Sequence, residues 1–484
     1  MTNAGRELCV GVDLGTQGPR VVIADAAGQV VGTAKSGWPI ERADGRHEQD
    51  PERWRRKIQD ALRQAVNQVK SSRRGEIGAL AVTSTSGTIV ATDAEGAPLR
   101  PAIMYDDRRA DAEAELANEA GAELIGRLGY RFRASFGLPK VLWLARNEPA
   151  TWQACRHVAH AADWVTARVS GEWTVSDHTN VLKTGYDLQA DRWPDFLDGL
   201  GVPIARLPRV LPTGTAIATV CAAVADACGL PAGVVVAAGP TDSNAAQIAA
   251  GASAPGQWSS ALGSSLALKG VSEQLIRDPA GALYCHRHPQ GWWLPGGASG
   301  VGGSCLNEHF DPGSFDRLDA EVAGRGPSGI LVYPLVGTGD WFPFWADEAA
   351  GFELGDPADE ADRYAGYLEG VALVERMAYD TVAALGAPVE GAIRITGGGS
   401  AIEVWRQIRA DILGRGVVQP AVPEAAIVAA SAHIHPGLAE AVAAMVHLGE
   451  PVAPRAERVE HYDSRCYRTP TEALADHHQL PTAA

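Results

Sequence analysis

The sequence lacks the paired cysteines that disulfide frameworks and cysteine zinc sites require. Its seven cysteines are odd in number and scattered over 484 residues, and no CxxC pair occurs. This pattern argues against a disulfide-bonded secreted domain and against a structural zinc site. We expect reduced thiols that pack as small hydrophobic side chains.

Long apolar runs and an excess of positive charge are also missing. No window reaches the roughly 20 apolar residues that cross a bilayer, and the first residues lack the pattern of a signal peptide. Lys and Arg number 42 against 58 Asp and Glu, which leaves a formal net charge of −16. Because such a surface repels phosphate backbones, we expect a cytoplasmic protein with no nucleic-acid and no membrane partner.

What the chain does contain is enough apolar material for two cores. Apolar residues make up 46% of its 484 residues, which is too long for one ordinary domain. A buried strand, a glycine turn and a second strand recur in both halves, and no long Pro/Ser linker separates them. We predict two packed α/β domains, 1–245 and 246–484.

The hydrophobic pattern predicts an antiparallel meander over residues 8–34, whose first two strands are joined by a glycine-bearing turn. A helix is predicted from Pro51 to about Val69, with Asp50 as its N-cap. Further predicted strands cover 77–82, 88–92, 234–238, 258–262, 266–269 and 393–396, and further predicted helices cover 107–130, 138–148, 244–250, 360–385 and 405–413.

One aspartate lies at the end of a predicted buried strand and a second follows another, where ligand sites of α/β proteins tend to lie. In the first motif, Gly15 and Thr16 can approach phosphate closely, and Asp13 can hold Mg²⁺ through water. A plain tight hairpin with a satisfied carboxylate explains this motif equally simply. In the second motif, GPTDSN, Asp242 suits a general base for a hydroxyl group, although a helix N-cap is the simpler local interpretation.

Two further glycine motifs lie in the second half. Gly263 and Ser264 offer backbone amides and a hydroxyl that could hold the phosphates of ATP, or form an ordinary hairpin turn. Three glycines at 397–399 follow an apolar strand and bury no side chain, which favours the close approach of a flat ligand such as adenosine to Gly398 and Gly399. Trp405 is interpreted either as a wall for the adenine or as a core tryptophan.

Small hydroxyls and acidic residues cluster at TSTSGT (83–88) and YDDRR (105–109). Ser86 and Asp106 could bind the hydroxyls of a sugar, whereas alternating charge at a solvated helix start is an equally plain interpretation of the second segment.

The order of six motifs resembles that of the FGGY carbohydrate-kinase family over roughly residues 8–450. The motifs are GVDLGTQG, SFGLPKVLWLARNEP, GPTDSNAA, SSALGSSLALKG, LEGVALVERMAYD and ITGGGSAIEVWRQIRADILG. The resemblance implies two ribonuclease-H-like domains of the actin/hexokinase-type ATPases flanking a central cleft. It implies ATP and Mg²⁺ as cofactors, a small sugar as the partner, and a monomer or homodimer. Within the family, TSTSGT and NVLKTGYD resemble the plant and cyanobacterial D-ribulose kinases, so D-ribulose is the expected acceptor.

The resemblance also implies roles for single residues. Asp242 is the expected catalytic base, and Asp13 and Asp242 are the expected magnesium contacts through water, both next to the substrate. Ser86 and Asp106 are the expected sugar contacts. The expected nucleotide contacts are Asp13, Gly15, Thr16, Gly263, Ser264, Gly398, Gly399 and Trp405.

The chain departs from the family pattern in several places. Gln17 and Pro19 replace the small residues that commonly follow the first Gly-Thr, Thr83-Ser84 stands in place of Asp-Gly, and the segment 333–345 lacks ERTP. These departures leave open a kinase for xylulose, glycerol or another polyol, or a weakly active sugar- or nucleotide-binding regulator. An actin- or chaperone-like ATPase is disfavoured because the chain has no peptide-binding domain.

Overall fold

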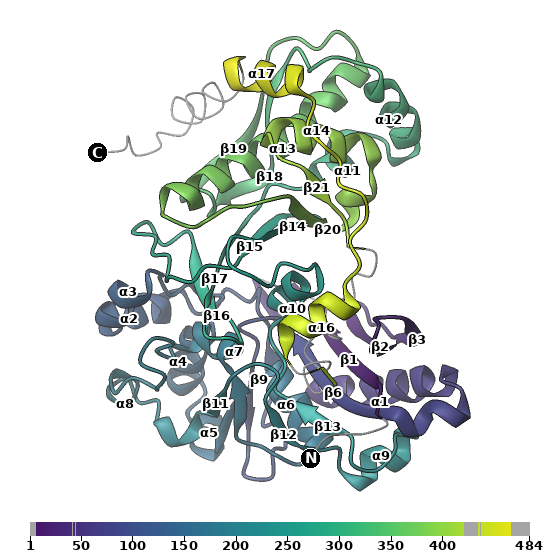
Figure 1. The fold of residues 1–484 in the computed structure, drawn as a ribbon. Coiled ribbons are helices and arrows are strands. Elements are labelled where there is room, and N and C mark those ends of the chain that lie inside the picture. Colours follow the sequence, from purple (N-terminus) through teal and green to yellow (C-terminus); the bar gives the residue numbers. More distant parts are fainter. Residues whose placement is uncertain (1–5, 41, 44, 421–433, 436, 466–484) are drawn as a thin grey trace. The chain divides into compact units, whose positions relative to one another are not determined.

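The protein forms two units, each built on its own six-stranded β-sheet (Figure 1). The structure is a computed structural model that describes residues 6–40, 42–43, 45–420, 434–435 and 437–465. The first unit comprises the chain up to Ala249 together with His286–Trp292 and the described part of Val422–His447, and the remaining residues form the second unit. No helix in the described ranges has the length and apolar character needed to span a bilayer.

The sheet of the first unit has the strand order β12-β13-β6-β1-β2-β3. Strands β1, β2 and β3 form an antiparallel meander. On the other side of β1, β6 runs parallel to β1, β13 runs parallel to β6, and β12 is antiparallel to β13. The strands are β1 (Leu8–Gly15), β2 (Gly18–Asp25), β3 (Val30–Lys35), β6 (Ile77–Ser84), β12 (Ala216–Thr219) and β13 (Val235–Ala237).

One face of this sheet is covered by a helix whose start the sequence encodes clearly. Helix α1 (Pro51–Gln68) begins with proline at its first position, and the Asp50 side chain accepts a hydrogen bond from the Glu52 amide. Its apolar stripe, which includes Trp54 and Ile58, packs with α6 (Ala161–Ser170) and α9 (Ala222–Cys228) against every second residue of the strands.

The opposite face carries smaller side chains and receives a segment from late in the chain. Cys9, Ala79 and Ala81 belong to this face, and Met445 of α16 (Leu438–Met445) packs on them. Other residues of α16 pack on α10 (Asp242–Ala249) around Ile248. Small residues let these helices approach the sheet closely, so α10 is held near the strand ends from which it starts.

A second, five-stranded sheet in the first unit has the order β4-β5-β8-β7-β9. Its strands are β4 (Arg42–Ala43), β5 (Arg46–Gln49), β7 (Ile89–Thr92), β8 (Ala102–Ile103) and β9 (His157–His160). The remaining elements of this unit include α2 (Asp111–Ala120), α3 (Ala122–Leu128), α4 (Gly137–Asn147), α5 (Pro149–Ala154), β10 (Val175–Asp177), α7 (His178–Val181), α8 (Phe196–Gly199) and β11 (Arg209–Leu211).

The sheet of the second unit repeats the plan of the first, with the order β16-β17-β15-β14-β20-β21. Here too an antiparallel run (β14, β15, β17) is followed by two strands parallel to its first member. The strands are β14 (Trp258–Leu262), β15 (Leu266–Gly270), β16 (Tyr284–Arg287), β17 (Trp293–Ser299), β20 (Ile393–Thr396) and β21 (Val417–Val418). The repeated plan agrees with the two sheets expected from the recurring strand–turn–strand pattern.

The second unit has a buried ion pair at its centre. Arg409 of α14 (Glu403–Leu413) makes two bonds of 2.7 and 2.8 Å to Glu375 of α13 (Glu360–Ala384), and a third of 2.9 Å to Ser260 of β14. Both charged side chains are fully buried. The other elements are α11 (Ser304–His309), α12 (Phe315–Ala323), β18 (Leu331–Asp340), β19 (Ala346–Leu354) and α17 (Ala456–Arg465).

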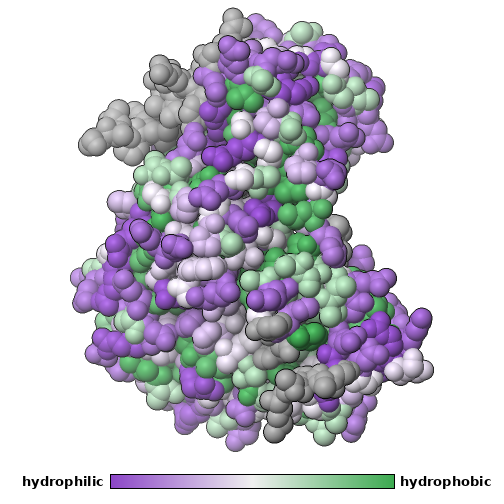
Figure 2. Space-filling view, viewed as in Figure 1, coloured by the Kyte–Doolittle hydropathy of each residue, from purple (hydrophilic) through white to green (hydrophobic). Residues whose placement is uncertain are grey.

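Most of the predicted elements are confirmed, with differences at glycines and in the late chain. The range predicted as helical at 107–130 contains two helices, α2 and α3, which are separated at Gly121. The first unit runs to Ala249 and also contains His286–Trp292 and the described residues of Val422–His447, whereas the sequence predicted one division between residues 245 and 246. Hydrophilic residues cover most of the face visible in Figure 2, in keeping with the acidic composition.

Candidate functional site

The first sheet brings two predicted site residues to one edge. Strands β1 and β6 run parallel with Asp13 opposite Thr83, and Ser84 at the end of β6 bridges to Thr241 in the same direction. Parallel neighbours present their carboxyl ends at the same edge, where open α/β sheets bind ligands. Asp13 and Asp242 therefore both lie at the carboxyl edge of this sheet.

Asp13 has an environment that combines burial with two partners. Thr83 donates its hydroxyl to the carboxylate at 3.3 Å, and the Arg20 guanidinium lies 3.9 Å away. Burial raises the pKa of Asp13 above its usual value, while Arg20 and the Thr83 hydroxyl act in the opposite direction. Thr83, one of the departures from the family pattern, thus supports the carboxylate that it neighbours.

Asp242 is the first residue of α10 and is half-buried, so its carboxylate is not sealed in a core. One of its oxygens accepts the backbone N–H of Ser243 at 2.6 Å. The turn before it needs glycine, because a Cβ at Gly239 would lie 2.0 Å from the Val82 carbonyl oxygen. The segment that carries Asp242 therefore passes in direct backbone contact with β6.

The predicted phosphate turn of the first unit is a two-residue hairpin. Gly15 pairs with Gly18, and Thr16 and Gln17 form the loop between them. Gly18 has φ of +140°, and a Cβ there would lie 2.0 Å from the Ser36 carbonyl oxygen. The backbone at Ser36 therefore packs directly against the turn, and only glycine fits at position 18.

A buried lysine bonds to backbone close in sequence to Ser86 and Asp106, the predicted sugar contacts. The Lys140 ammonium donates to the carbonyl oxygens of Gly87 at 3.0 Å, Met104 at 2.7 Å and Ser135 at 2.7 Å. Lys140 is fully buried, and burial moves its pKa well below the usual value. This one side chain thus joins the turn after Ser86 to the strand end before Asp106.

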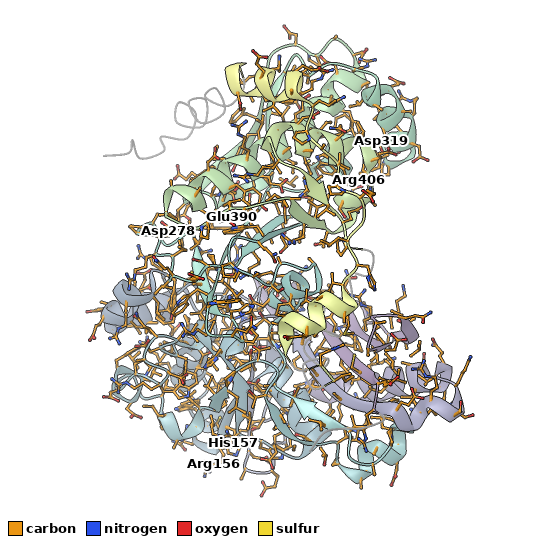
Figure 3. All side chains as sticks on the ribbon, in the orientation of Figure 1. Arg156, His157, Asp278, Asp319, Glu390 and Arg406 are labelled. Carbon is orange, nitrogen blue, oxygen red and sulfur yellow. The ribbon has the colours of Figure 1, made fainter. Side chains whose placement is uncertain are left out.

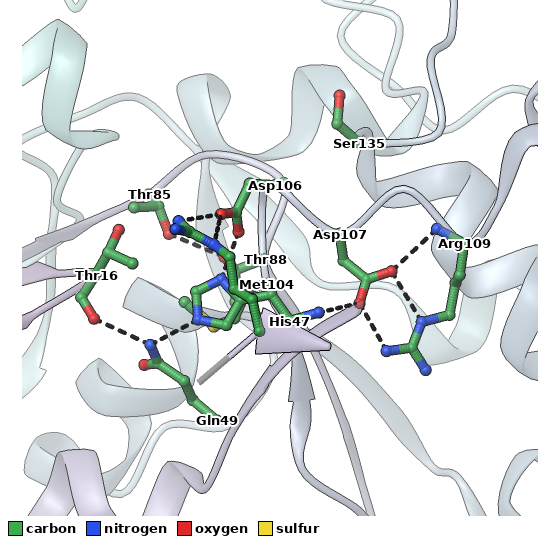
Figure 4. Close-up of polar contacts among 12 residues, drawn as sticks. Thr16, His47, Gln49, Thr85, Thr88, Met104, Asp106, Asp107, Arg109 and Ser135 are labelled. Carbon is green, nitrogen blue, oxygen red and sulfur yellow. Dashed lines mark hydrogen bonds and ion pairs between the residues drawn. The ribbon is translucent and has the colours of Figure 1, made fainter. Parts of the chain in front are cut away.

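The carboxylate of Asp106 lies in a polar cluster drawn in Figure 4. It accepts from His47 Nδ1 at 2.6 Å and from Arg42 at 2.6 and 3.0 Å. Gln49 Nε2 lies 3.2 Å from His47 Nε2 and 3.0 Å from the Thr16 carbonyl oxygen, and the Trp54 indole donates to Gln49 Oε1. Because indole nitrogen only donates, Gln49 directs its Oε1 to Trp54 and its amide nitrogen to His47, so His47 Nε2 accepts while Nδ1 faces Asp106.

Unsatisfied hydroxyls lie beside this cluster. Ser84 and Ser86 are buried, and among the described residues neither hydroxyl has a hydrogen-bond partner. Thr85 and Thr88 instead bond to each other at 2.9 Å. Buried polar atoms are usually paired, so these two serines are suited to bind hydroxyl groups of a ligand.

Sequence reasoning missed Lys140, His47 and Gln49. For Lys140 one signal was available. It is the single charged residue in the otherwise apolar start of the helix Gly137–Asn147, and a buried charge needs hydrogen-bond partners. His47 and Gln49 alternate along a short strand and carry no local sign of their shared contact with Asp106 and Thr16.

In the second unit, the predicted turn at Gly263 and Ser264 is braced by another glycine pair. The Gly303 amide donates to the Gly263 carbonyl at 2.8 Å, and the Ser304 hydroxyl donates to the Ser264 carbonyl at 2.8 Å. A Cβ at Gly302 would lie 2.5 Å from the Ser265 Cα. The close packing leaves the turn without bulky side chains.

The triple-glycine turn follows β20, which is parallel to β14. Gly397 has φ of +85°, and a Cβ there would lie 2.4 Å from the Leu262 carbonyl oxygen, so glycine is required by both conformation and space. Trp405 is only 1% exposed, and its indole N–H donates to the Leu368 carbonyl at 2.9 Å. These contacts favour the core role that the sequence left open for Trp405.

A cavity of about 720 Å³ opens next to this turn in the second unit. Asp319 of α12 and Arg406 of α14, both labelled in Figure 3, are among the residues that line it. The first residues of α14 reach this cavity, but Trp405 does not line it. Counting these two, the charged side chains of the lining are four arginines and four carboxylates: Arg325, Arg406, Arg455, Arg458, Asp316, Asp319, Glu369 and Glu403.

The described residues contain no group of three or more His, Cys, Asp or Glu side chains arranged to hold a metal. Asp13 and Asp242 are single carboxylates at a sheet edge, and Mg²⁺ typically uses one or two carboxylates plus water and substrate phosphates. The donors that are present fit that manner of binding.

Comparison with known proteins accounts for both units. The model of the FGGY family of carbohydrate kinases, N-terminal domain, matches residues 8–249, and that of the C-terminal domain matches residues 262–431. The chain belongs to this family. The predicted family and enzyme class, a carbohydrate kinase, are thereby confirmed.

Several relatives of this FGGY protein are named xylulose kinases. That of Escherichia coli (strain K12) is 27% identical over 487 residues, which is 94% of this chain and 96% of that protein. That of Streptomyces coelicolor is 34% identical over 303 residues, which is 61% of this chain and 60% of that protein. The narrower resemblance to D-ribulose kinases is not confirmed, since these relatives are named for another sugar.

A solved structure agrees over the whole chain. The xylulose kinase from Rhodospirillum rubrum superposes with a TM-score of 0.87 and 26% identity, covering 98% of this chain and 100% of that one. The predicted fold class, the two-domain α/β architecture of the actin- and hexokinase-like ATPases, is confirmed.

Proposed function

We propose that this protein transfers the γ-phosphoryl group of ATP to a hydroxyl of a ketopentose. The observation that carries the proposal is the placement of Asp13 and Asp242 at the same carboxyl edge of one sheet, with Asp242 half-buried rather than sealed. Phosphoryl transfer depends mainly on positioning and on charge stabilisation, which such an edge can supply.

In the proposed reaction, Asp242 accepts the proton of the attacking hydroxyl. The hydroxyl oxygen forms a bond to the γ-phosphorus while the bond to the bridging oxygen breaks, and ADP leaves. Mg²⁺, when bound through water near Asp13 and Asp242, supplies positive charge that offsets the phosphate oxygens. Backbone amides at Gly15 and Thr16 bind phosphate oxygens.

The adenosine part of ATP is assigned to the second unit. The 720 Å³ cavity is lined by Ala401, Ile402 and Glu403, which follow Gly398 and Gly399 after Ser400. A turn without side chains beside an open cavity suits the approach of a flat base and ribose. Gly263 and Ser264 remain proposed phosphate contacts.

The acceptor is proposed to bind at Ser86 and Asp106. The unpartnered Ser86 hydroxyl can bond to a sugar oxygen, and Asp106, whose side chain is 23% exposed, can accept from a sugar hydroxyl while Arg42 and His47 hold it. The named relatives favour D-xylulose as the acceptor. D-ribulose, suggested by TSTSGT and NVLKTGYD, is the second candidate.

The test is a panel of D-xylulose, D-ribulose, glycerol and gluconate with ATP and Mg²⁺, followed by ADP release. We expect a ketopentose to stimulate ADP release. Asp242→Asn should lower kcat by about 10²–10⁴-fold, the contribution typical of a general base, while nucleotide binding persists. The matched control is Asp226→Asn, which removes an exposed carboxylate of the same unit.

Two outcomes would contradict the proposal. Nucleotide binding without ADP release for any acceptor would indicate a regulator that kept the fold. A near-normal rate in Asp242→Asn would remove the assignment of the base while leaving the kinase activity in place.

A further inference from the structure

A buried carboxylate lies behind the segment that leads into Asp242. Asp177, the last residue of β10, is 1% exposed and caps α7. Its oxygens accept from the Thr179 hydroxyl at 3.0 and 3.1 Å, from the Asn180 amide N–H at 2.9 Å and from Asn180 Nδ2 at 2.7 Å. Thr213 also donates its hydroxyl to this carboxylate.

The two side chains gathered by Asp177 reach across to the backbone before Asp242. Thr179 Oγ1 accepts the Thr241 N–H at 2.8 Å, and Asn180 Nδ2 donates to the Gly239 carbonyl oxygen at 3.1 Å. Between these two anchored positions stands Pro240, which has no N–H to donate. The two anchors thus hold the backbone on either side of the proline.

The directions of these bonds are fixed by chemistry. A carboxylate only accepts, so Thr179 must give its single hydroxyl proton to Asp177, which leaves its oxygen lone pairs for the Thr241 N–H. Asn180 likewise uses one amide proton for Asp177 and the other for Gly239.

The same segment is held from its other side by β6. Thr241 bridges to Ser84, and Gly239 lies so close to Val82 that no Cβ fits between them. Asn244 also donates to the Thr241 hydroxyl at 2.6 Å. The backbone that ends at Asp242 is thus held between β6 and the residues bonded to Asp177.

We propose that Asp177, acting through Thr179 and Asn180, is a positioning residue that sets the location of the Asp242 carboxylate for proton transfer. The inference rests on the proposed role of Asp242 as the base. A buried charge costs desolvation energy, and a local cap for a four-residue helix does not require the two further bonds to Gly239 and Thr241. A misplacement of about 1 Å in a catalytic group can cost on the order of 10²-fold in rate.

The test compares Thr179→Val with Thr179→Ser in the full-length kinase. Valine keeps the shape but loses the bonds to Asp177 and Thr241, whereas serine restores the hydroxyl. We expect Thr179→Val to lower kcat at least about tenfold, with KM for the ketopentose and for MgATP within about twofold of the parent. Thr179→Ser should recover most of the lost kcat.

The matched control is Thr92→Val, which removes a buried hydroxyl of the same unit that bonds to the His157 carbonyl at 3.3 Å. It should leave kcat unchanged. A Thr179→Val enzyme with normal kcat, or equal losses in Thr179→Val and Thr92→Val, would overturn the inference.

A second variant covers the case in which Thr179→Val does not fold. Asn180→Ala removes the bond to Gly239, and we expect the same loss of kcat at unchanged KM values. Normal kcat in Asn180→Ala would overturn the inference. Asp242→Asn is measured in parallel: an active Asp242→Asn enzyme means that the base assignment fails, whereas an inactive one beside a fully active Thr179→Val means that only the positioning role fails.

Discussion

Lys140 brings a charged ammonium group into the interior of the first unit, where three backbone carbonyls surround it. Its burial moves the pKa well below the usual value, and the nearby Lys183 acts in the same direction. Three carbonyl acceptors match the three donors of the ammonium, so the group is fully satisfied. The lysine thereby fixes the spacing between the turn at Gly87 and the strand end at Met104.

We predict that Lys140→Met weakens both stability and sugar binding. Each carbonyl left buried without a donor costs about 1–3 kcal/mol, so the melting temperature should fall clearly. KM for the ketopentose should rise more than KM for MgATP, because Ser86 and Asp106 lie beside the released segments. Melting curves and steady-state kinetics check this, with exposed Lys70→Met as the control. Equal changes in both KM values would contradict a role confined to the sugar side.

Among the secondary structure elements, helix α13 and the C-terminal helix α17 are joined by a buried carboxylate. Glu369 accepts from the Ser328 amide at 2.9 Å and from the Tyr462 hydroxyl. Burial is the main cause that raises its pKa from 4.5 to about 7, and Asp362 adds to the shift. The proton is therefore bound more tightly in the folded protein than in the unfolded chain.

The pH dependence of stability follows from that difference. Because the pKa of Glu369 is higher in the folded protein, its bound proton stabilises the fold. This contribution to the free energy of unfolding is complete below pH 4.5 and is lost as the pH rises through about 7. The loss amounts to about 3 kcal/mol, since one pKa unit corresponds to about 1.4 kcal/mol. We predict that Glu369→Gln, which has no carboxyl proton to lose, gains stability relative to the parent between pH 5 and pH 8.

Melting temperatures at pH 5, 6, 7 and 8 without nucleotide measure this gain. The control is Glu457→Gln, an exposed carboxylate on α17. A difference between Glu369→Gln and the parent that stays constant with pH would contradict the prediction.

Elements whose signals are local were predictable from the sequence. Helix α1 is encoded by Asp50 and Pro51 at its start and by an apolar stripe, and the meander is encoded by apolar runs separated by glycine turns. Asp13 could be chosen because it lies near the end of a buried strand, and Asp242 because it stands between a buried strand and a helix. The glycines at 397–399 could be chosen because three in a row follow an apolar strand, although the structure shows that Gly397 is also required by close packing on Leu262.

Contacts between distant segments could not be predicted. The lysine at position 140 meets Gly87 and Met104, which lie 53 and 36 residues earlier in the chain. Asp177 reaches the backbone before Asp242 only through its neighbours Thr179 and Asn180. The position of Trp405 in the core, rather than in the cavity wall, depends on Leu368 of another helix. No local pattern encodes such pairings.

On the scale of the whole molecule, the cysteines behave as isolated buried side chains. Six described cysteines are free, and five of them are buried. Burial raises the pKa of Cys228 to about 11 and those of Cys9, Cys285 and Cys305 to about 12. Since the thiolate is the reactive form, these thiols should be inert in the folded protein.

We predict that melting temperatures with and without a reductant agree. Of the described thiols, only Cys221 should react quickly with Ellman's reagent, because it is the one that is partly exposed. Counting the fast-reacting thiols in the parent and in Cys221→Ala measures this. A count that does not fall by one in the variant would contradict the prediction.

The helix Leu438–Met445 has a consequence for synthesis on the ribosome. Met445 covers a sheet face that contains Cys9, Ala79 and Ala81, although the main part of this unit is complete at Ala249. At about 5–20 residues per second, the ribosome needs on the order of tens of seconds to deliver the covering helix. During that interval the nascent first unit carries an uncovered apolar face, so chaperone occupancy should be highest before the last helices emerge.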